Sequence, residues 1–323
     1  MESRMLDALD RDLVHALQLD GRAPFSKIAE VLGVSDQTIA RRYRRLRTAG
    51  TLRVVGAIDG GRLGLVSWAI RLRATPDAAG AIATALARRP DTYWVHLLSG
   101  GTEITCGTRT RTLEERDDLL LQKLPRTGRV SSVTAHAILH LFVGGTIGWS
   151  GLRSLSPEQA ERLRPDLPEP DDEPVDLSEA DHALLGALSV DGRAGHAELA
   201  AVTGWSESTV RRRMDQLRRA GVLFYDIDTP SEVFGHHVEA RLWVSVQPSK
   251  LAAVGEAMAG HPEVAFAGAT TGPTNLMVAV TCRDPNHLYR YLTEQVGSLD
   301  GVRDVETAPV IRTLKRAGAT LLR

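Results

Sequence analysis

The sequence predicts an α+β fold in which one module occurs twice along the chain. Each module is expected to hold a (winged) helix-turn-helix followed by a ferredoxin-like β-α-β-β-α-β domain. Three observations carry this prediction: a long internal repeat, one arginine-rich helix with matching end signals in each copy, and a change from helical to strand periodicity after that helix. With 323 residues, the chain is long enough for several domains with their own cores.

The internal repeat is clearest in the tetrapeptide Asp-Gly-Arg-Ala, which starts at Asp20 and again at Asp191. This offset of 171 positions continues through the first part of each copy and becomes 172 by Gly100 and Gly272. A repeat of this length indicates duplication of a whole module, and it is much too long for a solenoid repeat.

Three short helical patterns open each copy. The second covers residues 26–32 or 196–203, and a glycine turn leads from it into the third, within residues 35–50 or 206–221. The third pattern opens with a Ser suited to an N-cap and closes on a Gly suited to a C-terminal cap. Helix, glycine turn and capped helix together indicate a helix-turn-helix.

The third helix of each copy has an apolar stripe and a basic opposite face. Ile39, Tyr43 and Leu46 follow the spacing i, i+4, i+7, and the second copy repeats it. A short cationic helix of this kind can enter a DNA major groove, although a basic face can also simply be solvated. Its occurrence in both copies favours DNA. The residues predicted to reach phosphates or base edges are Gln37, Arg41, Arg42, Arg44, Arg45, Ser208, Arg211, Arg212 and Arg213.

The two arginine-rich helices are not equivalent. Asp215 and Gln216 stand where the first copy has Arg44 and Arg45. The second helix should therefore bind DNA less tightly and prefer a different half-site. A non-palindromic operator follows, with half-sites about one turn (~34 Å) or a multiple of it apart.

After each arginine-rich helix the hydrophobic pattern becomes that of strands and amphipathic helices. In the first copy we expect strands at 68–74, 92–98, 103–107 and 130–141, with helices at 77–88 and 113–123. In the second copy we expect strands at 240–246, 264–269, 275–281 and 302–314, with helices at 249–259 and 285–296. Both orders are β-α-β-β-α-β.

An acidic, proline-rich stretch at 165–176 separates the copies and is typical of an exposed, semi-rigid linker. A short helix capped by Ser156 is expected just before it. The predicted domains are helix-turn-helix domains at 1–55 and 177–226, ferredoxin-like effector and dimerisation domains at 56–145 and 227–323, and a helix with linker at 146–176.

Composition narrows the possible functions. The formal net charge of −1 means that any affinity for nucleic acid must come from local clusters. Cys106 and Cys282 lie far apart without metal-ligand spacing, so neither a disulfide scaffold nor a zinc site is expected. No signal or membrane-spanning pattern is present, and we expect a cytoplasmic protein with no membrane partner. We expect no catalytic residue, metal or cofactor.

Several stretches carry a resemblance to a known family. They are Leu6-Asp7, Asp20-Gly21-Arg22, Leu32-Gly33-Val34-Ser35 and Ala49-Gly50 in the first copy, and Asp191-Gly192-Arg193, Gly204-Trp205-Ser206, Ala220-Gly221, Thr270-Thr271-Gly272 and Leu299-Asp300-Gly301-Val302 in the second. With these residues the chain resembles the Lrp/AsnC (leucine-responsive, feast/famine) transcriptional regulators. The resemblance covers nearly all of the chain outside the linker.

The resemblance implies a sequence-specific, DNA-binding regulator whose partner is double-stranded DNA. Family members usually carry one module per chain and pair through their sheet domains. A chain with two modules is therefore expected to fold as a single-chain pseudo-dimer with its two sheets paired internally. Because family members also form larger rings, further association into a homo-oligomer is expected.

The resemblance also implies a small-molecule effector, such as an amino acid, near a Thr-Gly-x-x-Asp turn between paired sheet domains. The matching positions are Gly100 and Glu103 in the first copy and Gly272 and Asn275 in the second. Asn275 replaces the family's acid and lacks the charge to hold an amino group, whereas Glu103 retains it. Alternatively, these are ordinary tight turns in which glycine is needed for its backbone freedom.

Two other functions are possible on this fold. Sirohaem decarboxylases are similar in being fused or paired versions of the module, and residues 92–96 (Thr-Tyr-Trp-Val-His) are the nearest approach to their His- and Tyr-rich motif. The arginine-dense third helices favour DNA over this enzyme. A regulator that acts as an effector-independent DNA architectural protein is the other alternative.

Overall fold

The computed structural model describes residues 6–110, 112, 114, 117, 128–144, 152, 154–167, 175–316 and 319–320. The chain forms two compact units. The helical unit consists of the described residues up to Gly64 and from Leu152 to Gly235, and the sheet unit of those from Leu65 to Gly144 and from His236 onward. Each unit contains one part of both repeats, and the predicted fold class is confirmed.

In the helical unit, each repeat contributes three helices and a strand. The first repeat forms α1 (Ala8–Leu19), α2 (Phe25–Leu32), α3 (Asp36–Thr48) and β1 (Arg53–Ile58). The second repeat forms α7 (Glu179–Val190), α8 (His196–Thr203), α9 (Glu207–Arg219) and β6 (Leu223–Asp228). The helix expected after Ser156 is α6 (Pro157–Leu163), which begins with a capping box formed by Ser156 and Gln159.

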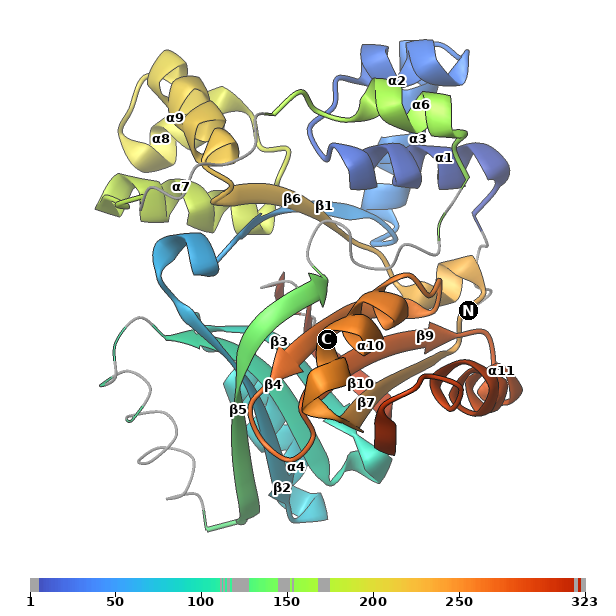
Figure 1. Cartoon of the computed structure of the whole chain (residues 1–323). Coiled ribbons are helices and arrows are strands. Elements are labelled where there is room, and N and C mark those ends of the chain that lie inside the picture. Colours follow the sequence, from blue (N-terminus) through green and yellow to red (C-terminus); the bar gives the residue numbers. More distant parts are fainter. Residues whose placement is uncertain are drawn as a thin grey trace. The chain divides into compact units, whose positions relative to one another are not determined.

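Strands β1 and β6 join the two repeats of the helical unit as an antiparallel ribbon (Figure 1). The pairing runs from Arg53 opposite Asp228 to Ile58 opposite Leu223, so each repeat supplies one strand. Gly56 lies directly under α7, because a Cβ atom at this position would come within 2.7 Å of the Leu188 Cβ. The second repeat's first helix therefore packs on the first repeat's strand.

The sheet unit contains two β-α-β-β-α-β-type halves. Each half has its own strands, and strands of one half pair with strands of the other. The first half has β2 (Val66–Ala74), α4 (Pro76–Ala87), β3 (Thr92–Leu98), β4 (Glu103–Thr110) and β5 (Val130–Val143). The second half has β7 (Val238–Val246), α10 (Leu251–Ala259), β8 (Val264–Thr270), β9 (Leu276–Cys282), α11 (Pro285–Arg290) and β10 (Val302–Arg316), with a short β11 (Ala319–Thr320). The order is β11-β10-β3-β4-β2-β5-β8-β9-β7, and β7 also pairs with β10.

The two long strands, β5 and β10, link the halves. β5 pairs with β2 of its own half and then with β8 of the other, and β10 pairs with β7 and then with β3. Each half also keeps its own apolar core beneath its helices, around Ile70 and Leu72 in the first and around Leu242 and Val244 in the second. The two sheets are thus paired within one chain.

One helix of the sheet unit differs from expectation, and two other predicted segments lie largely outside the described residues. The helix expected at 285–296 is α11 followed by a π-helical turn, Tyr291–Val296. The wider turn, with i→i+5 bonds, brings Tyr291 and Val296 toward one face, and both are buried. The helix expected at 113–123 and the middle of the linker at 168–174 lie outside the described residues, apart from the single positions Glu114 and Asp117.

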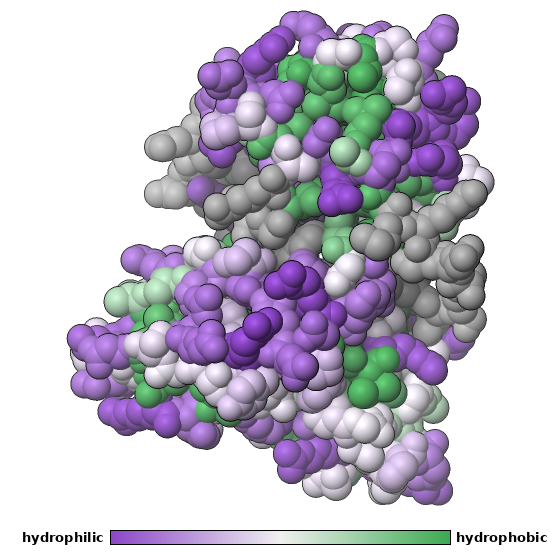
Figure 2. Space-filling model, turned by 90° about the vertical axis from the view of Figure 1, so that its right-hand side faces the viewer, coloured by the Kyte–Doolittle hydropathy of each residue, from purple (hydrophilic) through white to green (hydrophobic). Residues whose placement is uncertain are grey.

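Hydrophilic residues dominate much of the face in Figure 2, and hydrophobic residues gather there in patches. Among the large hydrophobic side chains that are exposed, Leu139 on β5 and Ile311 on β10 occupy equivalent positions of the repeat. Within the described part of the chain, no helix combines the length and the apolar character needed to cross a bilayer.

Candidate functional site

The two arginine-rich helices, α3 and α9, begin in the same way. Ser35 accepts a hydrogen bond from the Thr38 backbone N–H at 3.3 Å, and Ser206 accepts one from Thr209 at 3.2 Å. In front of each, Gly33 or Gly204 adopts a positive φ, which ends the preceding helix and turns the chain. These local features fix the start of each helix as the sequence predicts.

The apolar stripe of each helix is buried and the opposite face is exposed. Ile39, Tyr43 and Leu46 are buried in α3, and Val210, Met214 and Leu217 are buried in α9. Of the residues predicted to contact DNA, those that lie exposed are Gln37, Arg41, Arg44, Arg45, Ser208, Arg211 and Arg212. Among the described residues, no hydrogen-bond or ion-pair partner is found for Arg41, Arg44, Arg211 or Arg212. Arg212 also lines an open hollow of about 580 Å³ beside α9.

Arg42 and Arg213, also predicted to contact DNA, are held inside their own domains. Arg42 donates to Asp7 at 2.5 Å and to Asp10 at 2.8 Å, and Arg45 also pairs with Asp10. At the equivalent position of the second repeat, Arg213 donates from Nε and Nη2 to the two carboxylate oxygens of Asp181, at 2.7 and 2.9 Å. These pairs tie α3 and α9, which we call the recognition helices, to the first helix of their own domains.

Two of the acidic partners, Asp10 and Asp181, are buried, which makes their ion pairs structural, whereas the Asp7 side chain is 51% exposed. Asp10 and Asp181 are 3% and 2% exposed. Burial raises the pKa of Asp181, but hydrogen bonds from Arg213 and Ser178 more than offset it and hold that pKa below its ordinary value. The sequence did not indicate these partners, because Asp181 lies 32 positions before Arg213.

Each repeat also grips the other through its Asp-Gly-Arg-Ala turn. Arg22 donates to the Gly192 carbonyl at 2.9 Å and twice to the Ala194 carbonyl at 3.1 Å. Arg193 makes the matching bonds to the carbonyls of Gly21 at 2.7 Å and Ala23 at 3.1 Å. In the sequence this tetrapeptide marks the duplication and helps to carry the family resemblance, and its exact recurrence is the signal that it has a role.

The recognition helices take part in the same exchange. Arg47 of α3 pairs with Asp191 of the second repeat at 2.7 Å, and Arg218 of α9 pairs with Asp20 of the first at 3.2 Å. Arg47 and Arg218 are equivalent positions, as are Asp20 and Asp191, so the two bonds are reciprocal. Each recognition helix is therefore bonded to the opposite repeat.

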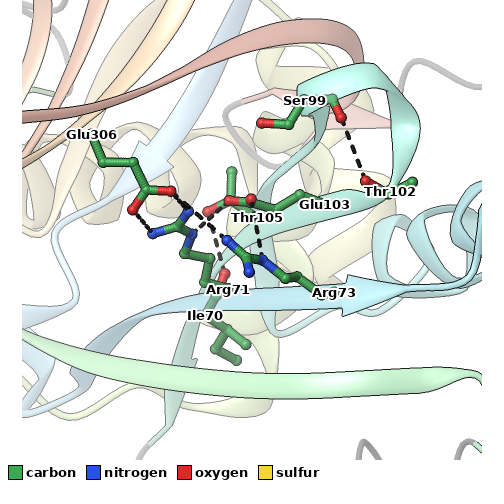
Figure 3. Close-up of polar contacts among 8 residues, drawn as sticks. All are labelled: Ile70, Arg71, Arg73, Ser99, Thr102, Glu103, Thr105 and Glu306. Atoms are coloured by element: carbon green, nitrogen blue, oxygen red, sulfur yellow. Dashed lines mark hydrogen bonds and ion pairs between the residues drawn. The ribbon is translucent and has the colours of Figure 1, made fainter.

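In the sheet unit, the first predicted effector turn leads to a charged cluster (Figure 3). Gly100 has a φ of 74°, as a tight turn requires, and Glu103 follows it at the start of β4 with 4% exposure. Glu103 accepts a hydrogen bond from Arg71 Nε at 2.5 Å, and Arg73 lies 3.8 Å from its other oxygen. The carboxylate predicted to hold an effector's amino group is thus already paired with the protein's own arginine.

Arg71 is the centre of this cluster. Besides Glu103, its guanidinium donates through both terminal nitrogens to Glu306 of β10. Burial lowers the pKa of Arg71, but its hydrogen bonds to Glu306 and Glu103 outweigh the effect of burial and the net shift is upward. The cluster joins β2 and β4 of the first half to β10 of the second.

The second predicted effector turn is held by different chemistry. The Asn275 side chain accepts from the Val246 backbone N–H at 2.8 Å and donates to the Val246 carbonyl at 2.9 Å. Gly272, with a φ of 102°, lies against His136 of β5, where a Cβ atom would overlap the imidazole ring. The His136 ring donates from Nδ1 to the Thr271 carbonyl at 2.7 Å. This turn is therefore fastened to two strands.

Equivalent positions of the two halves meet at Arg71 and Trp243. Arg71 pairs in register with Thr134 of β5, and 172 positions later Trp243 pairs with Glu306 of β10. The Arg71 guanidinium lies over the Trp243 ring, 4.8 Å from its centroid. Because the two positions are equivalent and in contact, they lie on the pseudo-twofold axis of the sheet unit.

A second polar contact inside the sheet unit involves His96. Its Nδ1 lies 3.1 Å from Thr313 Oγ1, and its Nε2 lies 2.6 Å from Nη2 of Arg241. Burial, and then the charge of Arg241, holds the pKa of His96 well below its ordinary value. Burial also lowers the pKa of Arg241 to about 10. In the described part of the chain, no three His, Cys, Asp or Glu residues are grouped to bind a metal.

Comparison with protein families gives matches in three stretches of the chain. The AsnC-type helix-turn-helix domain matches residues 6–47 and 177–218. The Lrp/AsnC ligand binding domain matches residues 239–320. The helix-turn-helix match therefore occurs once in each repeat.

Two curated relatives are similar to about half of the chain. An uncharacterized HTH-type transcriptional regulator of Pyrococcus abyssi is 34% identical over 146 residues, covering 45% of this chain and 91% of the relative. The HTH-type transcriptional regulator FL11 of Pyrococcus horikoshii is 32% identical over 143 residues, covering 44% of this chain and 93% of the relative. Each relative is thus matched over nearly all of its length by less than half of this chain.

Among solved structures, the siroheme decarboxylase NirDL is similar over nearly the whole chain. The TM-score is 0.64 at 14% identity, covering 95% of this chain and 93% of that one. At this identity the likeness concerns the fold alone. The likeness extends over both the helical unit and the sheet unit.

Proposed function

This chain belongs to the Lrp/AsnC family of transcriptional regulators, and from that premise we propose that it binds double-stranded DNA through two unlike helix-turn-helix domains, which we call its reading heads. The observation that carries the proposal is the exposed basic face of each recognition helix. This face consists of arginines other than those that form ion pairs inside the domain. On α3 this face includes Arg41 and Arg44, and on α9 it includes Arg211 and Arg212. Guanidinium groups without internal partners are available to phosphates and to guanine edges.

The two heads differ in how their charge is placed. Arg45 shares its guanidinium with Asp10, and Asp215 stands where α3 has Arg44. On α9, Arg211 adds an exposed cation at the position of Ala40. The heads therefore present similar numbers of available arginines in different positions, which supports unlike half-sites more strongly than it supports a large difference in affinity.

The test is fluorescence anisotropy of labelled duplexes from upstream of the chain's own gene, measured over a range of salt concentrations. Arg44→Gln and Arg212→Gln should each weaken binding and reduce the salt slope by about 1 if the residue meets a phosphate. A residue that reads a base should instead cost about 1–3 kcal/mol at one position of the site. Glu158→Gln, at an exposed position of α6, is a control that leaves the recognition helices unchanged. Equal, salt-independent affinity for all duplexes would contradict the proposal.

The effector and the homo-oligomer stay predictions. An amino-acid effector near Glu103 would have to displace Arg71, and one near Asn275 would have to displace the Val246 backbone. A shift in thermal midpoint with individual amino acids tests the first prediction, and light scattering tests the second. For the decarboxylase alternative, the nearest candidate, His96, has both ring nitrogens bonded inside the sheet unit, which supports a structural role.

A further inference from the structure

The recognition helices are connected by a reciprocal clamp, which we define as the turns Asp20–Ala23 and Asp191–Ala194 together with Arg47 and Arg218. We propose that this clamp fixes the spacing of the two reading heads, and that Arg47 and Arg218 are positioning residues and do not contact DNA. The inference rests on the proposed DNA-binding function for its consequence, but its structural part can be measured without DNA.

The two turns hold each other by bonds that need both partners. Each arginine of the turns, Arg22 and Arg193, directs its guanidinium to backbone carbonyls of the other turn. Asp20 and Asp191 shape the turns by accepting from the N–H of Arg22 at 3.1 Å and of Arg193 at 2.9 Å. The bonds are made to main-chain atoms, so they fix the path of one turn against the other.

Glycine allows the turns to approach the ribbon closely. A Cβ atom on Gly192 would come within 2.8 Å of the Val55 carbonyl carbon, and one on Gly21 would come within 2.6 Å of the Tyr225 Cβ. The Gly192 N–H also donates to the Val54 carbonyl at 2.8 Å. The clamp is thus built onto β1 and β6. At positions 21 and 192, no residue other than glycine fits unless the neighbouring atoms shift.

The two ion pairs extend the clamp to the recognition helices. Arg47 lies in the last turn of α3 and Arg218 in the last turn of α9, and each pairs with the Asp of the opposite turn. The Arg218 guanidinium also lies 5.4 Å from the centroid of the Tyr225 ring, and its side chain is only 18% exposed. Neither helix can swing independently without breaking a bond to the other repeat.

This arrangement separates two roles among arginines of the same helix. Arg44 is exposed and has no internal partner among the described residues, whereas Arg47, three positions later, is used to hold the opposite repeat. Replacing Arg47 should leave the number of phosphate contacts unchanged. It should instead loosen the relation between the heads, so that operators with altered half-site spacing become acceptable.

The experiment compares Arg47→Gln with Arg44→Gln, which remove the same charge from the same helix. Spin labels on Gln37→Cys and Ser208→Cys report the distance between the heads in the absence of DNA, and the native Cys106 and Cys282 are buried. We expect a narrow distance distribution in the parent and in Arg44→Gln, and a broad one in Arg47→Gln. Arg47→Lys keeps a cation that can reach Asp191 and leaves the bond from the Arg193 N–H to Asp191 intact, so it should restore the narrow distribution.

The same variants are then tested on duplexes whose half-sites are moved apart by one to five base pairs. Arg47→Gln should bind the altered spacings with much less discrimination than the parent at an unchanged salt slope, while Arg44→Gln should keep the spacing preference and lose about 1 in slope. A narrow distribution together with a reduced slope in Arg47→Gln would make Arg47 a phosphate contact and overturn the proposal. If Arg47→Gln gave a broad distance distribution but the parent protein bound no DNA, the clamp would be supported and the proposed function rejected. Should Arg47→Gln not fold, Arg218→Gln provides the equivalent test.

Discussion

The contacts that hold the helical unit together have kept the symmetry of the duplication, although the exposed faces of α3 and α9 differ. The sheet unit has lost that symmetry at equivalent positions. In the helical unit, Arg22 and Arg193 make the same bonds to opposite turns, and Arg42 and Arg213 pair with equivalent aspartates. In the sheet unit, positions 172 apart carry different chemistry. Arg71 corresponds to Trp243, Glu103 to Asn275 and Glu306 to Thr134.

The difference reflects what each contact requires. A bond from a guanidinium to a backbone carbonyl depends on the path of both turns, so neither repeat can change without loosening the other. The charged cluster around Arg71 depends on side chains alone, and each half can satisfy its buried groups in its own way. Symmetry has thus persisted where contacts are reciprocal and has been lost where they are not.

The largest effect is expected from breaking the charged cluster. Arg71→Met should lower the free energy of unfolding of the sheet unit by about 3–5 kcal/mol, because it removes the hydrogen-bonded cation from the buried Glu103 and leaves it with Arg73, 3.8 Å away. Urea denaturation followed by tryptophan fluorescence measures this change. Adding Glu103→Gln should recover much of the loss. If Arg71→Met and the double variant Arg71→Met with Glu103→Gln were equally unstable, the buried Glu103 carboxylate could not be the cause of the loss.

The next effect tests the symmetry of the helical unit. Asp10→Ala and Asp181→Ala should each cost about 2–3 kcal/mol, since each removes the charged acceptor of hydrogen bonds that hold a recognition helix. Circular dichroism during urea denaturation gives both values. Costs differing by more than 1–2 kcal/mol would show that the matching geometry hides unequal energetics.

The ion pair of Asp181 with Arg213 predicts a dependence on pH. The pKa of Asp181 in the folded protein is below its ordinary 3.8, so the stability it contributes is complete above that pH and is lost as the pH falls through the folded value. The difference in stability between the parent and Asp181→Ala should therefore shrink below about pH 4. A difference that stayed constant down to pH 2 would argue against an ionic origin.

A smaller effect is expected at the second turn of the sheet unit. Asn275→Asp retains an acceptor for the Val246 N–H but loses the donor to the Val246 carbonyl, which should cost about 1–3 kcal/mol at neutral pH. Protonation of the new carboxyl should restore part of this loss in acid. Thermal unfolding at pH 7 and pH 4 measures both values. Unchanged stability at pH 7 would mean that Asn275 does not hold the turn.

The smallest effect again compares the two repeats of the helical unit. Ser35→Ala and Ser206→Ala should each cost about 1 kcal/mol, because each removes an N-cap acceptor from an exposed helix start. Thermal midpoints of the two variants should fall together. A loss confined to one variant would show that the two helix starts are not energetically equivalent.

Sequence reasoning succeeded where the signal is local. The caps at Ser35 and Ser206, the buried stripe through Tyr43, and the strand at 92–98 all depend on residues within a few positions of one another. The succession of strands and helices along the chain follows from the same local patterns. The lengths of β5 and β10 were also close to expectation, although their second pairings were implied only by the family resemblance.

The partners of the buried charges could not be found in this way. Arg71 and Glu306 are 235 positions apart, and only folding brings them together. Similarly, the sequence marks Arg42 and Arg213 as basic but does not show that Asp10 and Asp181 bind them. Asn275 was judged by the charge it lacks, whereas its role in the structure comes from the two hydrogen bonds its amide makes at once.

The contact between Arg71 and Trp243 has a consequence for the choice of pairing partner. In an assembly of identical subunits, a residue on the twofold axis meets its own copy, so an arginine there would face an arginine. Fusion of two modules allows the two sides to differ, and a cation can rest on an aromatic ring. A first half that strayed to the first half of another chain would bring two guanidinium groups together. The chain thereby carries its own preference for folding upon itself over exchanging halves with a neighbour.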